Sequence, residues 1–345
     1  MANNDWQEYQ FIQGAVFNNE TIVSFGNIEN ELKCTQNQNV ICDLSHLGLL
    51  EISGDDALTF LQGQVTNDVK LLNGSNAHYS GYCSPKGRLL ALFFAFSHNQ
   101  KLHLQLNHKL LDPISKRLKM YVMRSKVNLN NVSDSIVKIG LNGNDVPTTL
   151  VPFFKQIPEH AYESFSTENA TLIRIAGNKP RFEIICDTGQ AKVIWQALKT
   201  QCKPVGRACW EWLEIQAGIP DVFVHTQEEF VPQMVNLDLL NAINFKKGCY
   251  TGQEIVARTH YLGKVKRRTH LAHLNTSTPP QAGNDVLNAN NEAVGKVVRS
   301  APAPNGGYDV LAEIRLESVE AGNLLINDVQ LEFQQLPYEL NTTEL

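Results

Sequence analysis

The stretch GYCSPKGRLLALFFAF, residues 81–96, constrains the fold of this chain more than any other. Two apolar runs flank the turn-forming tripeptide Pro85-Lys86-Gly87, which predicts two strands joined by a tight turn. The run HLQL that follows alternates apolar and polar residues, and LLDPISKRLKMYVM then has apolar residues at helical spacing. Strand, hairpin and helix succeed one another without a GxGxxG motif, so the pattern favours an α+β fold over a dinucleotide-binding fold.

The rest of the chain repeats this pattern once and then changes character. A second block, residues 171–219, contains two predicted strands and two predicted helices. After Arg268, short alternating runs are separated by Gly, Asn and Pro turns, as in a small all-β module. We therefore predict an αβ region over 1–265, with subdomains of roughly 1–150 and 151–265, and an all-β domain over 266–345.

Composition limits the classes of partner. A chain of 345 residues, 43% of them hydrophobic, exceeds the size of a single core, so two or three subdomains are expected. Its net charge of -5 argues against coating nucleic acid by bulk charge, and any anion site must be local. The N-terminal sequence lacks a signal-peptide pattern, and no apolar run is long enough to span a membrane. We expect a cytoplasmic protein without a membrane partner.

The seven cysteines form neither a CxxC pair nor a Cys/His cluster of zinc spacing, so no metal site is predicted. Most are expected to be reduced core thiols. Cys249 differs, because it stands in the sequence KKGCYTGQE, residues 246–254, between two glycines and after two lysines. The residues alone leave a working thiol and an inert buried cysteine equally open.

A predicted helix start gives Cys249 its surroundings. Thr251 and Glu254 have the spacing of a capping box, in which a hydroxyl and a carboxylate satisfy the free N–H groups of the first helical turn. Cys249 would then lie two residues before the cap, near the positive end of the helix and beside Lys246 and Lys247. Such surroundings favour the thiolate over the thiol.

The segment that follows is strongly basic. Residues 246–268 contain seven Lys or Arg residues against Glu254 alone, a net charge of +6. This excess indicates an anion-binding surface, and the alternative is a solvated charged face. Another candidate is weaker. Asp43, Ser45 and His46 are sequence neighbours without a GxSxG nucleophile turn, so a strand end or cap is the better interpretation.

Several segments resemble one known family. They are ISGDDALTFLQGQVTNDV, SPKGR, LKMYVMRSKV, WEWLEIQAGIPD, FVPQMVNLDLLNAINFKKGCYTGQEIVAR and the closing β segment. Together they resemble the YgfZ family, folate-binding proteins linked to iron–sulfur cluster maintenance and tRNA modification and related to the glycine cleavage T-protein. The resemblance implies a T-protein-like architecture: αβ subdomains around a central opening that admits folate, followed by a small C-terminal β-barrel.

The same resemblance implies the site. Cys249 would be the functional cysteine, and its loop would be shaped by Lys247, Gly248, Tyr250, Thr251, Gly252, Gln253 and Glu254, with Arg258 on the next helix. The implied ligand is tetrahydrofolate or a derivative. Its expected contacts are Trp210, which alternatively is a core residue, Leu47, where some relatives carry Trp, and Gln216, where T-proteins carry a glutamate that pairs with the pterin.

Two departures from T-proteins bear on activity. T-proteins carry acidic residues after the SPKGR-like turn, whereas this chain has Leu89-Leu90-Ala91-Leu92, and a hydrocarbon cannot orient a reacting amine. The amide of Gln216 also loses the charge assistance of a glutamate. The resemblance therefore implies a factor that is not an enzyme of the T-protein kind.

Three functions follow from these observations. The first is a folate-binding accessory factor for iron–sulfur enzymes such as tRNA methylthiotransferases, with Cys249 as its working thiol. One thiolate cannot hold a cluster alone, so a partner or the folate must complete the chemistry. The alternative is a tetrahydrofolate-dependent aminomethyltransferase. The third, direct tRNA binding through residues 246–268, ranks lower because the sequence shows no RNA-reading motif and no interleaved aromatic platform.

Overall fold

The computed structural model describes residues 4–261 and 263–340. The chain forms two compact units, and each gathers segments that are far apart in sequence. Unit 1 comprises Met1–Ala57, Leu71–His78 and Phe94–Glu211. Unit 2 comprises Leu58–Lys70, Tyr79–Phe93 and Trp212–Leu345. The sequence-based boundaries near residues 150 and 265 stay a prediction.

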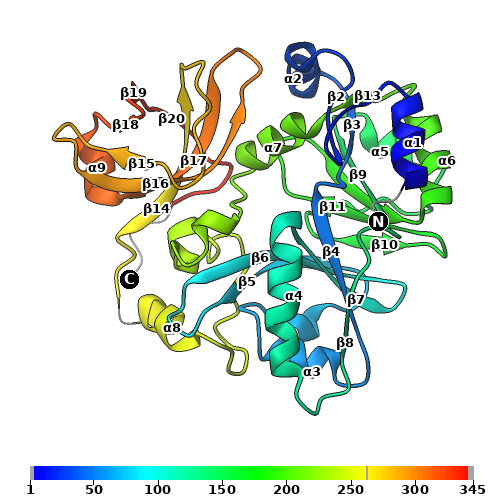
Figure 1. Cartoon of the computed structure of the whole chain (residues 1–345), viewed down its shortest axis with the longest axis horizontal. Coiled ribbons are helices and arrows are strands. Elements are labelled where there is room, and N and C mark those ends of the chain that lie inside the picture. The colour runs from blue at the N-terminus through cyan, green and yellow to red at the C-terminus, as the bar shows by residue number, and fades with distance from the viewer. Residues whose placement is uncertain (1–3, 262, 341–345) are drawn as a thin grey trace. The chain divides into compact units, whose positions relative to one another are not determined.

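Unit 1 is built on a six-stranded sheet of order β10-β11-β12-β9-β3-β13, in which only the pairing of β13 with β3 is parallel. Its strands are β3 (Val40–Asp43), β9 (Val137–Asn142), β10 (Ser164–Ser166), β11 (Ala170–Ile175), β12 (Arg181–Cys186) and β13 (Lys203–Val205). Three helices pack against it: α1 (Asn4–Ile12), α5 (Val146–Leu150) and α6 (Thr188–Leu198). Trp6 and Trp195 bring α1 and α6 together over this sheet in the hydrophobic core (Figure 1).

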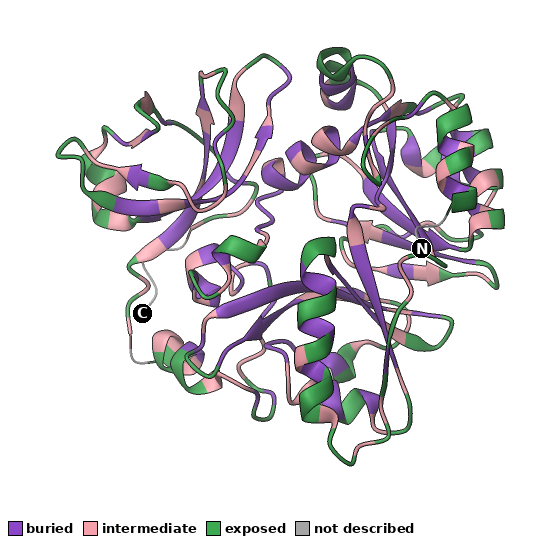
Figure 2. Ribbon diagram, viewed as in Figure 1, coloured by how far each residue is buried: buried purple, intermediate pink, exposed green. Residues whose placement is uncertain are grey.

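A five-stranded sheet of order β5-β6-β7-β4-β8 comes next, and the division between the units passes through β5 and β6. Its strands are β4 (Leu47–Ser53), β5 (Ala77–Cys83), β6 (Leu89–His98), β7 (Lys101–Asn107) and β8 (Asn128–Asn131). The helix α4 (His108–Val122) packs on β4 and exposes its outer face (Figure 2). The predicted strands on either side of Pro85-Lys86-Gly87 are confirmed, because β5 and β6 are hydrogen-bonded neighbours.

Unit 2 contains an antiparallel seven-stranded sheet of order β19-β18-β15-β16-β17-β14-β20. The strands are β14 (Arg267–Leu274), β15 (Asp285–Leu287), β16 (Ala293–Pro302), β17 (Tyr308–Arg315), β18 (Leu325–Ile326), β19 (Val329–Gln330) and β20 (Glu332–Gln334). Its two edge strands, β19 and β20, are separated by Leu331 alone, so the sheet curls into a nearly closed barrel around an apolar core. The predicted α+β fold with a small C-terminal β-barrel is thereby confirmed.

The remaining elements are short. They are β1 (Val16–Asn18), β2 (Thr21–Ser24), α2 (Ile28–Asn37), α3 (Ala57–Gln62), the 3-10 turns η1 (Val69–Leu71), η2 (Val224–Thr226) and η3 (Pro232–Val235), α7 (Arg207–Gln216), α8 (Gln253–Tyr261) and α9 (Leu316–Ala321). Among residues 4–261 and 263–340, no helix is both long and apolar enough to cross a bilayer.

A buried histidine generates a test of this fold. His103 of β7 stacks on Phe96 with ring centroids 5.6 Å apart, and burial lowers its pKa to about 4. The unfolded imidazole titrates near 6.5, so the unfolded state binds more protons between pH 6.5 and 4. Stability is therefore expected to fall as the pH falls through this window.

The variant His103→Phe keeps an aromatic ring against Phe96 and removes the titrating group. Urea unfolding at pH 7 and pH 5 should show a smaller loss of unfolding free energy in this variant than in the wild type, by about 2 kcal/mol. His108→Phe is the matched control, because His108 is exposed at the start of α4. Equal pH dependence in all three proteins would contradict the assignment.

Candidate functional site

Cys249 lies in the loop that precedes α8 in unit 2, and its side chain is exposed. The other six cysteines are free and buried, as expected for core thiols. Nothing lies within 4 Å of a Cβ atom built on the neighbouring Gly248, so this side of the loop is open. A reagent or partner can therefore reach the thiol from the Gly248 side.

Lys247 anchors the loop from its buried side. Its ammonium group points into the protein and donates to three backbone carbonyls, those of Gln62 at 2.8 Å, Val65 at 2.6 Å and Asn67 at 2.8 Å. Three N–H donors thus meet three acceptors. Burial lowers the pKa of Lys247 to about 8. The sequence analysis placed both lysines beside the thiol, but only Lys246 is exposed. The ammonium group of Lys247 instead binds the segment between α3 and η1.

That segment is tied to the chain before Cys249 by further hydrogen bonds. The hydroxyl of Thr66 donates to the carbonyl of Ala242 at 2.7 Å and accepts from the backbone N–H of Gly81 at 2.7 Å. The amide of Asn67 donates to the carbonyl of Asn241 at 2.8 Å. Two sequence segments that lie about 180 residues apart therefore form one polar network in unit 2.

The turn after β5 fixes the other end of the loop. Gly87 has φ +67° and Gly252 has φ +84°, a backbone region that favours glycine. A Cβ at Gly252 would lie 2.5 Å from the carbonyl oxygen of Ser84, and one at Gly87 would lie 2.7 Å from Cβ of Ile255. The SPKGR turn can approach the start of α8 because both positions lack a side chain.

The prediction of a capping box formed by Thr251 and Glu254 is wrong. The helix α8 begins at Gln253, which makes Gly252 the cap, and Cys249 lies three residues before it. Neither Thr251 nor Glu254 forms a side-chain hydrogen bond with any residue that the structure describes. The positive φ of Gly252, imposed by its contact with the SPKGR turn, starts the helix later than the polar pattern indicated.

Of the remaining loop residues, Tyr250 is buried and Gln253 is half-buried. The Tyr250 ring centroid lies 5.1 Å from Nζ of Lys247, and burial raises the pKa of the phenol above its ordinary value. Arg258 is exposed on α8. Tyr250 therefore belongs to the anchored side of the loop, whereas Arg258 belongs to the solvent side.

The structure places Trp210 and Leu47, two predicted folate contacts, in unit 1. Trp210 is 1% exposed; its ring packs over Gly140, and the guanidinium carbon of Arg181 lies 4.6 Å from the ring centroid. Leu47 is half-buried at the start of β4 and pairs with Asn107 of β7. Trp210 is thus a core residue of unit 1 in this structure, and its contact with folate stays a prediction.

Gln216, the third predicted contact, lies in unit 2 at the end of α7. Its amide donates to Oδ2 of Asp309 at 2.9 Å, and the indole N–H of Trp212 donates to the same oxygen at 2.8 Å. Nδ1 of His273 lies 2.8 Å from Oδ1 of Asp309. This carboxylate joins the end of α7 to the barrel strands, and sequence reasoning missed it because its partners lie 25 or more residues away.

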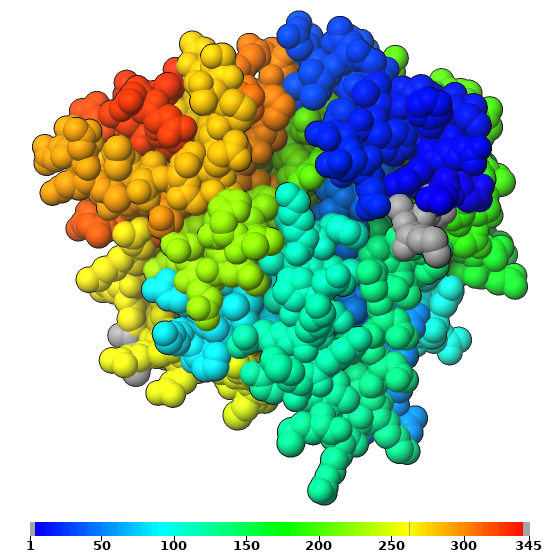
Figure 3. Space-filling view, in the orientation of Figure 1, coloured from blue at the N-terminus to red at the C-terminus, as the bar shows by residue number. Residues whose placement is uncertain are grey.

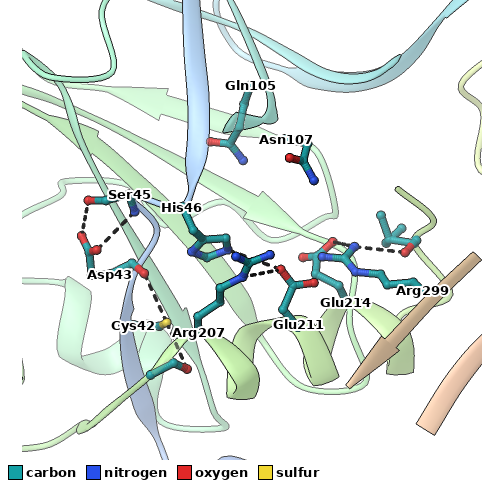
Figure 4. Close-up of polar contacts among 12 residues, drawn as sticks. Cys42, Asp43, Ser45, His46, Gln105, Asn107, Arg207, Glu211, Glu214 and Arg299 are labelled. Carbon is teal, nitrogen blue, oxygen red and sulfur yellow. Dashed lines mark hydrogen bonds and ion pairs between the residues drawn. The ribbon is translucent and has the colours of Figure 1, made fainter. Parts of the chain in front are cut away.

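A second polar cluster in unit 1 was also missed (Figure 4). Nε of Arg207 donates to Oε1 of Glu211 at 3.1 Å, and Nε2 of His46 lies 3.8 Å from that oxygen. Asp43 instead accepts from Ser45, so these neighbours do not form a triad. Their interpretation as a strand end is consistent with the position of Asp43 at the end of β3.

Gln105 of β7 contributes a polar group that has an unused acceptor. Its Nε2 donates to both carboxylate oxygens of Glu183, at 3.2 and 3.0 Å. Its Oε1 is buried and accepts no hydrogen bond from any residue that the structure describes. Gln105 and Asn107 lie two positions apart on β7 and therefore share one face of the sheet (Figure 4). Leu47, which pairs with Asn107, lies on the same face.

The anchoring of the loop can be tested directly. Lys247→Met leaves the three carbonyls without their donors, so the unfolding free energy should fall by about 1–3 kcal/mol. Modification of Cys249 by a thiol reagent should also change rate, because the loop loses its fixed position. Lys246→Met is the matched control and should change stability by less than about 0.5 kcal/mol. Equal effects of the two substitutions would show that the hydrogen bonds to Lys247 do not hold the loop.

Comparison with known proteins identifies the family. The family model described as the GCVT N-terminal domain matches residues 6–247. The tRNA-modifying protein YgfZ of Yersinia pestis (strain Pestoides F) is 31% identical over 306 residues, which cover 87% of this chain and 92% of that protein. The protein of the same name from Pectobacterium carotovorum subsp. carotovorum (strain PC1) is 30% identical over the same shares.

A solved structure supports the fold. The crystal structure of glycine cleavage system aminomethyltransferase T from Bartonella henselae matches with a TM-score of 0.79 and covers 96% of both chains at 17% identity. At this identity the likeness shows a T-protein-like fold and nothing about activity. Because the family model and the relatives each match most of the sequence, the chain belongs to the YgfZ family of proteins with the GCVT N-terminal domain.

Proposed function

We propose that this protein is a folate-binding accessory factor for tRNA modification, and that Cys249 is its reactive group. The observation that carries the proposal is the contrast among the cysteines: one is exposed on an anchored loop, and six are buried. The family relatives named tRNA-modifying protein YgfZ support the link to tRNA. The clients we propose are iron–sulfur enzymes such as tRNA methylthiotransferases.

The geometry of the loop supports a working thiol. A cysteine reacts as its thiolate, and it must be accessible to do so. Lys247 and the contact between Gly87 and Gly252 hold the backbone on both sides of Cys249, while Gly248 leaves the approach open. A group held in this way can be presented repeatedly in one geometry, which favours transfer or ligand exchange with a partner. Because one thiolate cannot retain a cluster, the partner supplies the other ligands.

The proposed ligand is tetrahydrofolate or a derivative. The T-protein-like fold supports it, and the residues of unit 1 include a group that fits a pterin. The pterin ring carries N–H donors, and Oε1 of Gln105 is a buried acceptor that no described residue uses. Leu47 and Asn107 lie on the same face of the sheet and would offer one apolar and one polar contact. When bound, folate would supply a one-carbon carrier, and these side chains would bind and orient it.

Aminomethyl transfer is the weaker candidate. The likeness to an aminomethyltransferase structure concerns the fold, whereas transfer needs an acidic group to hold the amine. The corresponding residues, Leu89 to Leu92, are apolar and buried in β6. Nothing at these positions can accept a proton or a hydrogen bond through its side chain.

The thiol is tested by complementation. In a bacterial strain lacking its own relative, the wild-type chain should restore the methylthiolated nucleoside in tRNA, measured by mass spectrometry of digested tRNA. Cys249→Ala should fold normally and fail to restore it, because the thiol is lost. Cys34→Ala, which removes a buried cysteine of α2, is the matched control and should restore it. Full restoration by Cys249→Ala would rule out a working thiol.

The ligand is tested by calorimetric titration with tetrahydrofolate under anaerobic conditions. Saturable binding is expected, and Gln105→Leu should weaken it about 5- to 150-fold, since a buried acceptor contributes about 1–3 kcal/mol. Gln196→Leu, a change at an exposed position of α6, should bind like the wild type. Absence of binding to the wild-type chain would remove folate from the proposal.

A further inference from the structure

Three aromatic side chains form a cluster at the surface of unit 2, close in sequence to the Cys249 loop. The rings of Phe245 and His260 stack face to face, with centroids 3.7 Å apart and planes 10° apart. Tyr261 stands edge-on to both, at 4.7 Å from His260 and 6.1 Å from Phe245. Tyr261 is 60% exposed, so a flat ring at the end of α8 faces solvent. Figure 3 shows the segment around residues 250–260, in yellow, at the surface of the molecule.

Exposed cations adjoin this cluster in the chain. Four have no side-chain hydrogen bond or ion pair with any residue that the structure describes: Lys246, Arg258, Lys264 and Lys266. Lys246 follows Phe245 directly, and Arg258 lies one helical turn before Tyr261, so its side chain shares that face of α8.

The other cations of residues 246–268 form contacts within the protein and stabilise the fold. Arg268 forms a two-pronged ion pair with Asp238 at 2.6 and 2.9 Å, and Arg267 pairs with Glu313 at 3.0 Å. Lys247 is buried under the Cys249 loop. The four exposed cations are opposed by Glu254 alone within residues 246–268, which leaves a local charge of +3 in a chain whose net charge is -5.

This combination of groups selects among possible partners. Single-stranded nucleic acid offers flat bases that stack on aromatic rings and phosphates that attract Lys and Arg. An acidic protein would use the cations but not the stacked rings. A membrane surface would require a broad apolar helix face, whereas α8 exposes Arg258 and Glu254 beside Ile255 and Tyr261.

We infer that the aromatic–cationic patch, formed by Phe245, His260, Tyr261, Lys246 and Arg258 and followed in the chain by Lys264 and Lys266, binds an unpaired segment of RNA. The choice of RNA over DNA rests on the proposed function in tRNA modification, and the unpaired loop of a tRNA stem–loop has the required chemistry. An exposed base stacks on Tyr261, and the flanking phosphates contact the cations. Cys249 is three residues from Lys246, so bound RNA and the thiol share one segment of the chain.

Fluorescence anisotropy with the full chain tests this inference. The probe is a labelled 17-nucleotide RNA stem–loop with a seven-nucleotide loop, compared with a blunt RNA duplex of equal charge at low and moderate salt. The stem–loop should bind more tightly, with an affinity that falls as salt rises. Tyr261→Ala should weaken stem–loop binding by about tenfold, as expected for the loss of one stacking partner.

Matched variants separate stacking from charge. Tyr261→Phe keeps the ring and should bind like the wild type, and Tyr121→Ala, which removes an exposed tyrosine of α4, should also have no effect. A double change of Arg258 and Lys264 to Ala should weaken binding and flatten its dependence on salt. Unchanged thermal unfolding of each variant would show that folding is intact.

Three outcomes would overturn the inference: no binding of the stem–loop, equal affinity for the duplex, or full affinity in Tyr261→Ala. Cosedimentation with phosphatidylglycerol vesicles in place of RNA binding would assign the patch to a membrane surface instead. The assay contains neither folate nor a client enzyme. Failure here with successful complementation by the wild type would remove the RNA site alone, whereas a failed complementation would remove the proposed function itself.

Discussion

The ammonium group of Lys247 is buried beneath the loop that carries Cys249. A buried ammonium ion is costly unless every N–H finds an acceptor, and here three carbonyls within residues 62–67 provide them. The loop cannot move without breaking these bonds. On the other side, Gly87 and Gly252 approach so closely that neither tolerates a side chain. The backbone that carries the exposed thiol is therefore fixed on one side by Lys247 and on the other by the contact between Gly87 and Gly252.

The basic segment divides its charges between two tasks. Lys247, Arg267 and Arg268 bind backbone carbonyls or carboxylates of unit 2, so they stabilise this unit. Within the part of the chain that the structure describes, the four exposed cations have no such partners, and they accompany an aromatic cluster at the end of α8. An anchored thiol and a surface suited to a polyanion thus occur within one short stretch of the chain. This arrangement is consistent with a factor that acts on a partner or its RNA rather than on a small substrate enclosed in a pocket.

The sequence alone determined the fold class and the family. The turn around Pro85-Lys86-Gly87 predicted neighbouring strands, and the alternating runs after Arg268 predicted the β-barrel, because these signals depend on residues close together in the chain. The motif around Cys249 and the segments that accompany it led to the family, which the comparisons confirmed. The residues around Cys249 did not decide between an exposed working thiol and a buried inert one. Only the resemblance to the family favoured the exposed thiol.

The tertiary structure decided which neighbouring groups act together. Thr251 and Glu254 had the pattern of a cap, but the packing of Gly252 against a distant turn shifted the helix start. The stack of Phe245 on His260 joins residues fifteen positions apart, and the contact of Gln216 with Asp309 spans 93. Such contacts depend on the path of the whole backbone, since burial and hydrogen bonding are settled by groups that no local pattern brings together. The chain's composition therefore fixed how many cations it has, whereas its folding fixed which of them remain free to bind.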